Sequence, residues 1–252
     1  DGNLIDPYGG MEDIKNKLLK SVSASFDEDP LRVLRVARFA SKLKFLDFKI
    51  ENKTLELMKK ISSSGEIETL SKERVWLETY KALSTGNPEE YFSILLKVGA
   101  LEKICQPMDL NLNALEKTSS DNQDHAIKWS VSISENENIE NINNSFNAPK
   151  EFSEISEICS QINTFSSKKI SPESLMDLVK KSDLLRKPER FYRASKASSY
   201  IIEPLLKPEK WIEIYDLLSD IRVDKTLREG KLIAKKLNAD RLTAIKNYLE
   251  KL

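Results

Sequence analysis

The sequence predicts an all-α protein. Apolar residues recur at intervals of three and four through almost every segment after residue 10, which is the spacing of one face of an α-helix. Helix start and stop signals separate these segments, among them Asp29-Pro30, Ser71 and Gly99. No repeat with a period of about 20 to 50 residues is present, which argues against a solenoid. The spacing of the predicted helices favours an antiparallel helical array.

The first ten residues are the exception to the helical pattern. Residues 1–10 are typical of the end of a strand hairpin that closes in a turn, and three of the seven glycines of the chain stand here. The chain offers no partner strand for this segment. We therefore expect a remnant of a β-structure whose other strands precede residue 1.

The next two helices differ in the strength of their signals. Residues 11–20 carry apolar side chains at helical spacing and predict a short amphipathic helix. The following helix has a clear start, because Asp29 suits the N-cap and Pro30 the first helical position. Further helices are expected at residues 52–61, 72–83 and 89–98, with Ser71 as an N-cap and Gly99 as a stop.

The composition changes after residue 110. Residues 111–147 are rich in Asn, Ser, Glu and Asp and poor in large apolar side chains, which predicts that most of this stretch is a loop or a linker. Helical periodicity then returns over residues 152–162, 172–181, 189–201, 208–218, 226–236 and 239–252.

Several classes of protein are excluded by the residue content. No apolar run approaches the roughly 18 residues of a transmembrane helix, so we expect a soluble cytoplasmic protein without a secretory signal. The two cysteines, Cys105 and Cys159, are too few for a disulfide scaffold and are expected as buried small hydrophobes. The single histidine, His125, cannot build a histidine metal site or a catalytic dyad and is expected at the surface. No metal site is expected within this chain.

Charge is balanced overall but unevenly distributed. Lys and Arg total 40, as do Asp and Glu, yet residues 11–60 carry a net +4, residues 168–196 a net +5 and residues 222–252 a net +5. Residues 135–160 carry a net −5. The basic stretches could form one face that binds nucleic acid, or they could be ordinary solvated helix faces.

One helix places an acid and several cations on a single face. Asp29, Arg32, Arg35, Arg38 and Lys42 follow one another at steps of three or four residues. The apolar remainder of this helix predicts burial on most sides: Leu31, Val33, Leu34, Val36, Ala37, Phe39, Ala40 and Leu43. Guanidinium groups can donate to base edges or phosphates while a carboxylate accepts from an exocyclic amine, so the row could read a nucleotide. The alternative is a surface Asp29–Arg32 ion pair worth less than about 1 kcal/mol beside a solvated basic stripe.

Residues 28–40 resemble the nucleotide-recognition motif of the class II tRNA nucleotidyltransferase and poly(A) polymerase family. The flanking segments agree with the family in order: residues 4–10 with Asp13, residues 73–78 and residues 99–101. The resemblance covers about residues 1–107. The run Lys187-Pro188-Glu189-Arg190 extends it, more weakly, toward the bacterial CCA-adding branch.

The resemblance implies a head, neck, body and tail. It divides this chain into the end of the catalytic head (1–10), a nucleotide-recognition neck (11–65), a body (66–110), a linker or shortened metal-free start of the tail (111–150) and a helical, tRNA-binding tail (151–252). It implies that Asp29 and Arg32 read the Watson–Crick edge of CTP or ATP. Arg35 and Arg38 would support nucleotide or phosphate binding, with Glu28 and Arg74 in supporting places and Arg74 bracing the neck.

The function implied is the transfer of CMP and AMP from CTP and ATP to the 3′ end of tRNA. The Gly-Ser and Asp-x-Asp residues that hold Mg²⁺ in the family are expected in a head upstream of residue 1, and Asp27-Glu28-Asp29 matches Asp-x-Asp only in letters. The isolated chain is therefore expected to be inactive. The paired His-Asp ligands of the family's phosphohydrolase tails are also missing, so that activity is not expected.

Two other functions stay open at this point. The chain could be a noncatalytic tRNA-binding module or one subunit of a split enzyme, which the basic stretches would serve equally well. It could also be part of a poly(A) polymerase, because the motifs are shared. The sequence does not decide the oligomeric state.

Overall fold

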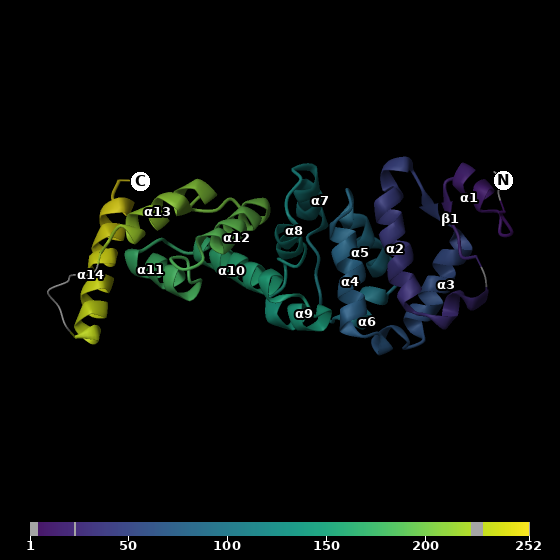
Figure 1. Cartoon of the computed structure of the whole chain (residues 1–252), viewed down its shortest axis with the longest axis horizontal. Helices are drawn as coiled ribbons and strands as arrows, with labels where there is room; N and C mark the ends of the chain where they lie inside the picture. Colours follow the sequence, from purple (N-terminus) through teal and green to yellow (C-terminus); the bar gives the residue numbers. More distant parts are fainter. Residues whose placement is uncertain (1–4, 23, 223–228, 252) are drawn as a thin grey trace. The chain divides into compact units, whose positions relative to one another are not determined.

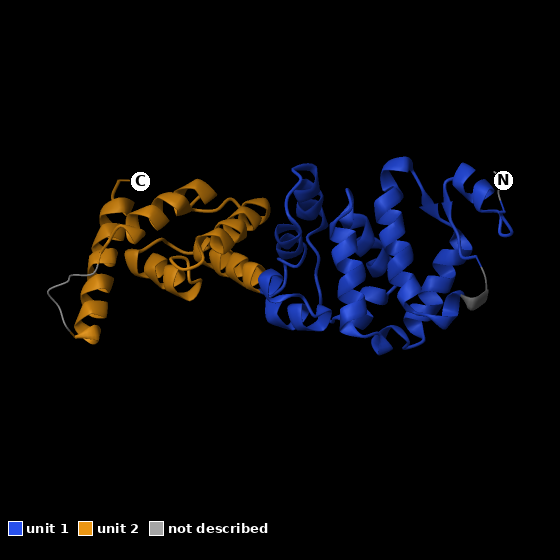
Figure 2. Ribbon diagram, in the orientation of Figure 1, with its two compact units in different colours: residues 1–153 blue, residues 154–252 orange. Residues whose placement is uncertain are grey.

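The computed structural model of the chain describes residues 5–22, 24–222 and 229–251, and it divides into two compact units, residues 1–153 and 154–252 (Figure 2). The predicted all-α class with a minor β component is confirmed. In the described residues the strands are the two-residue β1 (Leu18–Leu19) and β2 (Lys49–Ile50), which pair in parallel with Leu18 opposite Lys49.

The start of the chain differs from the sequence prediction. Helix α1 covers only Gly10–Lys15, and β1 follows where the helix was expected to continue. The expected strand end is absent from residues 5–9, while residues 1–4 lie outside the described part of the chain. Asp6 instead accepts hydrogen bonds from the backbone nitrogens of Gly10 (2.7 Å) and Met11 (2.9 Å), so its carboxylate caps α1.

A group of packed helices forms the centre of the first unit. Helix α2 (Leu31–Leu43) packs against both α4 (Lys72–Leu83) and α5 (Pro88–Lys97) (Figure 1). The bounds predicted for α4 are confirmed, and Gly99, at φ +75°, follows α5 as the predicted stop. The remaining elements of this part are η1 (Ala24–Glu28), η2 (Lys44–Leu46), α3 (Asn52–Ser63), η3 (Ile67–Thr69) and α6 (Ala100–Ile104).

The burial of α2 is less complete than its sequence predicts. Val33, Leu34 and Ala37 are fully buried, as expected. Phe39 is 38% exposed, however, while Val36 and Leu43 are only half-buried. Helix α2 therefore keeps one solvent-facing side, and an aromatic ring lies on it.

The prediction of a loop or linker between residues 111 and 147 is wrong. This stretch forms α7 (Leu112–Ser120), α8 (His125–Ser132) and α9 (Ile139–Phe146). The polar residues that suggested a loop are the N-caps of these helices: the side chains of Asn111, Asp124 and Asn138 accept from backbone nitrogens of the first turns. The few large apolar residues are enough because most of them are buried.

Those apolar residues join the core of the first unit. The Trp129 ring lies edge-on to Trp76 of α4, at 5.2 Å between centroids, and to Phe146 of α9, at 5.1 Å. Its indole nitrogen donates to Asn143 at 2.8 Å. Residues 111–146 are thus part of the packed body of the unit.

The regular secondary structure in the described residues of the second unit is all helical. Its helices are α10 (Lys150–Ser166), α11 (Pro172–Lys181), α12 (Pro188–Ile201), α13 (Pro208–Ser219) and α14 (Gly230–Leu249). Three of them begin with proline, which is favoured at the first helical position. The two separate helices predicted after residue 225 are wrong: α14 is continuous, and residues 226–228 of the first lie outside the described part.

The Lys187-Pro188-Glu189-Arg190 run has a structural position in the second unit. Arg190 Nη1 lies 2.7 Å from Glu154 of α10, and its Nη2 donates to the carbonyl of Ser182 at 2.9 Å. Phe191, the next residue, is buried against Trp211 with ring centroids 4.8 Å apart. The run therefore ties the start of α12 to two other segments of its unit.

Candidate nucleotide-recognition site

The start of α2 is organised by Asp29. Its Oδ1 accepts from the backbone nitrogen of Leu31 at 3.1 Å, so the carboxylate caps the helix as the sequence predicts, although regular helix begins at Leu31 rather than at Pro30. The Asp29 side chain is 32% exposed. One side of this carboxylate is thus held by the helix and part of it faces solvent.

Arg74 of α4 holds the same carboxylate from another direction. Its Nη2 lies 3.0 Å from Oδ1 and 2.9 Å from Oδ2 of Asp29. One guanidinium nitrogen that contacts both oxygens restricts the position of the carboxylate. Arg74, which was expected in a supporting place, therefore lies next to Asp29 at the start of α2.

Arg38 does not share the solvent-facing side of α2 with the other cations. Its Nε lies 2.6 Å from Glu78 Oε2 on α4, and the two side chains are only 14% and 6% exposed. The guanidinium also lies 4.4 Å from the centroid of the Phe39 ring. Arg38 is thus occupied by an ion pair inside the packed interface of α2 and α4.

The remaining cations of α2 lie on its exposed side. Arg35 is exposed and makes no ion pair with any described residue, and Arg32 is half-buried with a polar partner of its own. At about 100° per residue, Arg32, Arg35, Phe39 and Lys42 fall within about 80° of arc. We call these four residues the open face of α2. Glu28, the other supporting residue, is exposed at the end of η1.

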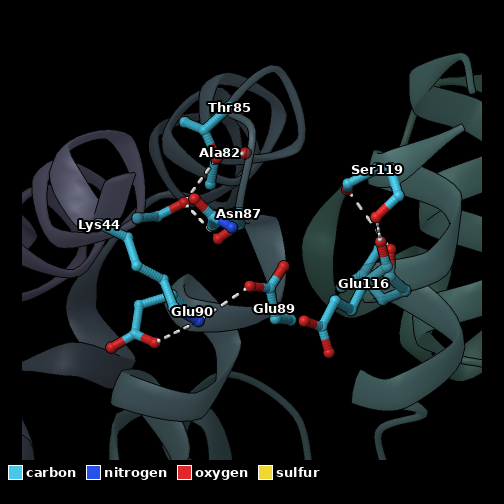
Figure 3. Close-up of polar contacts among 11 residues, drawn as sticks. Lys44, Ala82, Thr85, Asn87, Glu89, Glu90, Glu116 and Ser119 are labelled. Carbon is cyan, nitrogen blue, oxygen red and sulfur yellow. Dashed lines mark hydrogen bonds and ion pairs between the residues drawn. The ribbon is translucent and has the colours of Figure 1, made fainter. Parts of the chain in front are cut away.

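The far end of α2 is fixed by a second set of charges. Lys44 Nζ lies 3.0 Å from Glu89 and 3.1 Å from Glu90, both at the start of α5 (Figure 3). Partial burial by itself would lower the pKa of Lys44, but the bonds to the two carboxylates outweigh it and raise that pKa. The open face is therefore carried by a helix anchored at both ends, by Asp29–Arg74 and by Lys44.

The structure also locates the other residues singled out from the sequence. Both cysteines are buried and free, as predicted, and burial raises the pKa of the Cys159 thiol to about 12. His125 is half-buried, not a surface residue, because its ring lies edge-on to Tyr80 at 5.0 Å between centroids. Burial lowers the pKa of this imidazole, and the charge of Lys128 lowers it further.

Two negative findings hold for residues 5–22, 24–222 and 229–251. No group of three or more His, Cys, Asp or Glu side chains is placed to hold a metal ion there, and this includes Asp27, Glu28 and Asp29. In the same residues, no helix has the length and apolar character needed to cross a bilayer.

Two residues of this site were missed by the sequence reasoning. Glu78 is 40 residues from its partner Arg38, so only the packing of α4 on α2 reveals the pair. Phe39 was expected in the core because it is aromatic and stands in an apolar helix. Its position relative to Arg35, four residues earlier on the same side, was the signal that could have placed it on the open face.

The comparison with known proteins places this chain in a family. A family model described as "Probable RNA and SrmB-binding site of polymerase A" matches residues 47–109. The CCA-adding enzyme of Coxiella burnetii is 34% identical over 261 residues, which covers 99% of this chain and 69% of that protein. The CCA-adding enzyme of Actinobacillus succinogenes is 63% identical over 100 residues, which is 40% of this chain and 25% of that protein. The chain therefore belongs to the family of CCA-adding enzymes.

Solved structures show a similar fold. A CCA-adding enzyme in complex with ATP is matched over 96% of this chain and 62% of that one, with a TM-score of 0.65 and 16% identity. A Thermotoga maritima CCA-adding enzyme complexed with tRNA is matched over 96% of this chain and 63% of that one, with a TM-score of 0.63 and 17% identity. This chain spans about half the length of several curated relatives, such as 55% of the Pseudomonas entomophila enzyme.

Proposed function

We propose that this chain is the nucleotide-recognition and tRNA-binding part of a tRNA nucleotidyltransferase that adds CMP and AMP, from CTP and ATP, to the 3′ end of tRNA. The observation that carries the proposal is the Asp29 carboxylate, held by Arg74 at the start of a helix on which Arg35 is exposed and Arg32 half-buried. Cytosine and adenine both present an exocyclic amine on the Watson–Crick edge, and a carboxylate can accept a hydrogen bond from this amine.

In this proposal each residue has a separate role. Asp29 accepts from the exocyclic amine of the base, Arg32 donates to a ring acceptor, and Arg35 contacts phosphate. Arg74 orients Asp29, and Glu28 supports the same end of α2. Arg38 acts from inside the interface by holding α2 against α4 rather than by touching the nucleotide, which modifies the role expected from the family resemblance.

The catalytic carboxylates are proposed to lie in another domain, a head that precedes the neck. The described residues provide no ligand set for Mg²⁺, so no metal-dependent step is assigned to them. Helix α1 supports a neighbouring domain, because it has no buried residue and leaves Met11 54% and Ile14 60% exposed. A surface of this kind is what a covering domain would bury. We therefore expect the isolated chain to incorporate no nucleotide.

The second unit is proposed to bind tRNA. Residues 154–252 contain 20 Lys and Arg against 15 Asp and Glu, a net of +5, whereas the first 153 residues carry a net −5. A positively charged helical unit suits the phosphate backbone of RNA. In the proposed domain map the neck and body lie in the first unit, and the tail begins near the boundary at residue 153.

A second candidate is poly(A) addition. It is favoured by the family model over residues 47–109, whose description refers to polymerase A. The same open face of α2 would then select ATP alone. Binding of CTP separates the two candidates.

The test is calorimetric titration of the whole chain with CTP, ATP and GTP at low and high salt. We expect CTP and ATP to bind more tightly than GTP, with a signal that persists at high salt because base edges are read. Arg32→Ala should impair this selection more than tRNA binding. Lys59→Ala, which removes an exposed Lys59–Glu56 pair on α3, is the matched control. Binding of tRNA alone, lost steeply with salt, would instead identify a noncatalytic RNA-binding module.

A further inference from the structure

The open face of α2 continues beyond the residues proposed to read the base. Phe39 is ten residues beyond Asp29, which corresponds to about 15 Å of helix. This is further than a base held at Asp29 and Arg32 extends. Phe39 and Lys42 therefore lie beyond the residues proposed to read the base, and their exposure needs another explanation.

The Phe39 ring is a supported platform. The guanidinium of Arg38 lies 4.4 Å from the ring centroid and covers one face of the ring. Arg38 is itself fixed by the 2.6 Å contact with Glu78, whose side chain is only 6% exposed. The ring is nevertheless 38% exposed. The Arg38–Glu78 ion pair therefore supports the Phe39 ring on one face, while part of the ring remains exposed to solvent.

Cations stand on both sides of this ring. Arg35 lies one turn before Phe39 and Lys42 one turn after it, and both side chains are exposed. Neither makes an ion pair with a residue in the described parts of the chain. An exposed aromatic ring between two available cations is the arrangement that proteins use to stack a base and hold the adjacent phosphates of single-stranded nucleic acid.

We propose that Phe39, Arg35 and Lys42 form a stacking site for the 3′-terminal base of the single-stranded RNA acceptor. This inference rests on the proposed function and extends it. It leaves Asp29 and Arg32 to the base of the incoming nucleotide, and it assigns Phe39, Lys42 and the phosphate contact of Arg35 to the RNA end. The base stacks on the exposed part of the Phe39 ring. The two cations contact the phosphate on the 5′ side of that base and the next phosphate along the strand.

The test uses the whole chain and a short single-stranded RNA with 2-aminopurine at its 3′ end. Fluorescence of 2-aminopurine is quenched when the base stacks on an aromatic ring, so quenching reports the proposed contact directly. We expect quenching with the unmodified chain and with Phe39→Tyr. Phe39→Leu should abolish most of the quenching and weaken binding about tenfold. Lys42→Gln should weaken binding and reduce its salt dependence, because one phosphate contact is lost.

Two controls make the result specific to this site. Phe45→Leu removes a ring that is 73% exposed in η2, beyond the end of α2, and should leave quenching unchanged. An RNA duplex whose 3′-terminal 2-aminopurine is already stacked in the helix should show no quenching that depends on Phe39. Thermal unfolding of Phe39→Leu shows whether the variant is folded.

The outcomes distinguish this inference from the proposed function. Quenching that is equal in Phe39→Leu and in the unmodified chain would overturn the stacking site. If CTP still binds in an Arg32-dependent way in that case, only the assignment of the RNA end is wrong. If CTP does not bind either, the proposed function fails independently. If Phe39→Leu unfolds, Phe39→Tyr and Lys42→Gln decide, and loss of quenching in Phe39→Tyr would count against the site.

Discussion

The carboxylate of Asp29 and the guanidinium of Arg74 meet at 2.9 Å across 45 residues of sequence, from the start of α2 to the first turns of α4. Asp29 also caps α2, so a single side chain links helix initiation to the packing of two helices. Its orientation is set before any ligand arrives. In the proposed reaction this means that the acceptor for the exocyclic amine is preorganised.

Arg74→Ala should separate nucleotide recognition from stability. The pair is 47% and 32% exposed, so its loss should cost less than about 1 kcal/mol of unfolding free energy. Affinity for CTP should fall about tenfold, because the Asp29 carboxylate loses its contact with Arg74 and keeps the bond from the Leu31 backbone nitrogen alone to orient it. Calorimetric titration and urea unfolding measure the two effects. Arg186→Ala, which removes an exposed pair with Asp183, is the control. Unchanged CTP affinity in Arg74→Ala would show that Asp29 needs no orienting partner.

Glu78→Gln should be strongly destabilising. The variant leaves the Arg38 guanidinium largely buried without its counter-charge, and breaking such a pair costs about 3 kcal/mol or more. The midpoint of urea unfolding should drop accordingly. Glu56→Gln on α3 removes a carboxylate that is 70% exposed and lies 3.0 Å from the Lys59 ammonium group. This variant should leave the midpoint almost unchanged. Similar effects of both variants would mean that the Arg38–Glu78 pair contributes no more than a surface contact.

The Asn-rich stretch provides a direct test of folding. Trp129 is fully buried, and Trp129→Ala should cost about 3 to 5 kcal/mol. Asn143→Ala, which leaves the indole nitrogen without its acceptor, should cost about 1 to 3 kcal/mol. Asn144→Ala, at an exposed position one residue later, is the control for both. Urea unfolding would detect these losses, and three equally stable variants would show that residues 111–147 are a linker after all.

Alkaline pH should destabilise the second unit through Cys159. Burial raises the pKa of this thiol from 9.0 to about 12, so between these pH values the folded state binds more protons than the unfolded state. Stability therefore falls as pH rises through this window, by about 1.4 kcal/mol at pH 10 from this group. Urea unfolding at pH 8 and pH 10 should show a smaller loss in Cys159→Ala than in the unmodified chain. Equal losses would mean that the buried thiol does not contribute.

Local signals in the sequence predicted much of the fold. Helix α4 has the expected bounds, and α11 begins at Pro172 and ends at Lys181 as predicted, because proline at the first turn and an apolar stripe act over a few residues. The loop prediction for residues 111–147 was wrong because the structure of this stretch depends on contacts with residues distant in the sequence. Asn, Asp and Ser favour turns and helix caps alike, and only the burial of Trp129 and its neighbours decides between them.

The candidate site was predictable only in part. The capping role of Asp29 is a local property and was expected. The pairing of Arg38 with Glu78 is a property of the packed helices, since nothing within either segment marks the other as a partner. A helical periodicity of three and four residues placed Arg38 beside Arg35, whereas in the structure Arg38 pairs with Glu78 of α4. The roles of Asp29, Arg32, Arg35 and Arg38 toward a nucleotide stay predictions.

The course of α10 affects how this protein can be divided for experiments. Phe152, in its first turn, packs edge-on against Trp76 at 5.0 Å, so a version that stops before residue 150 would leave a core tryptophan of the first unit uncovered. A version that stops after Ser166 would instead lack the rest of the second unit, to which the buried Ile155, Ile158 and Ile162 belong. Either truncation therefore removes part of the packing around apolar side chains that are buried in the whole chain. We therefore expect limited proteolysis to spare this helix, and truncated versions cut here to aggregate.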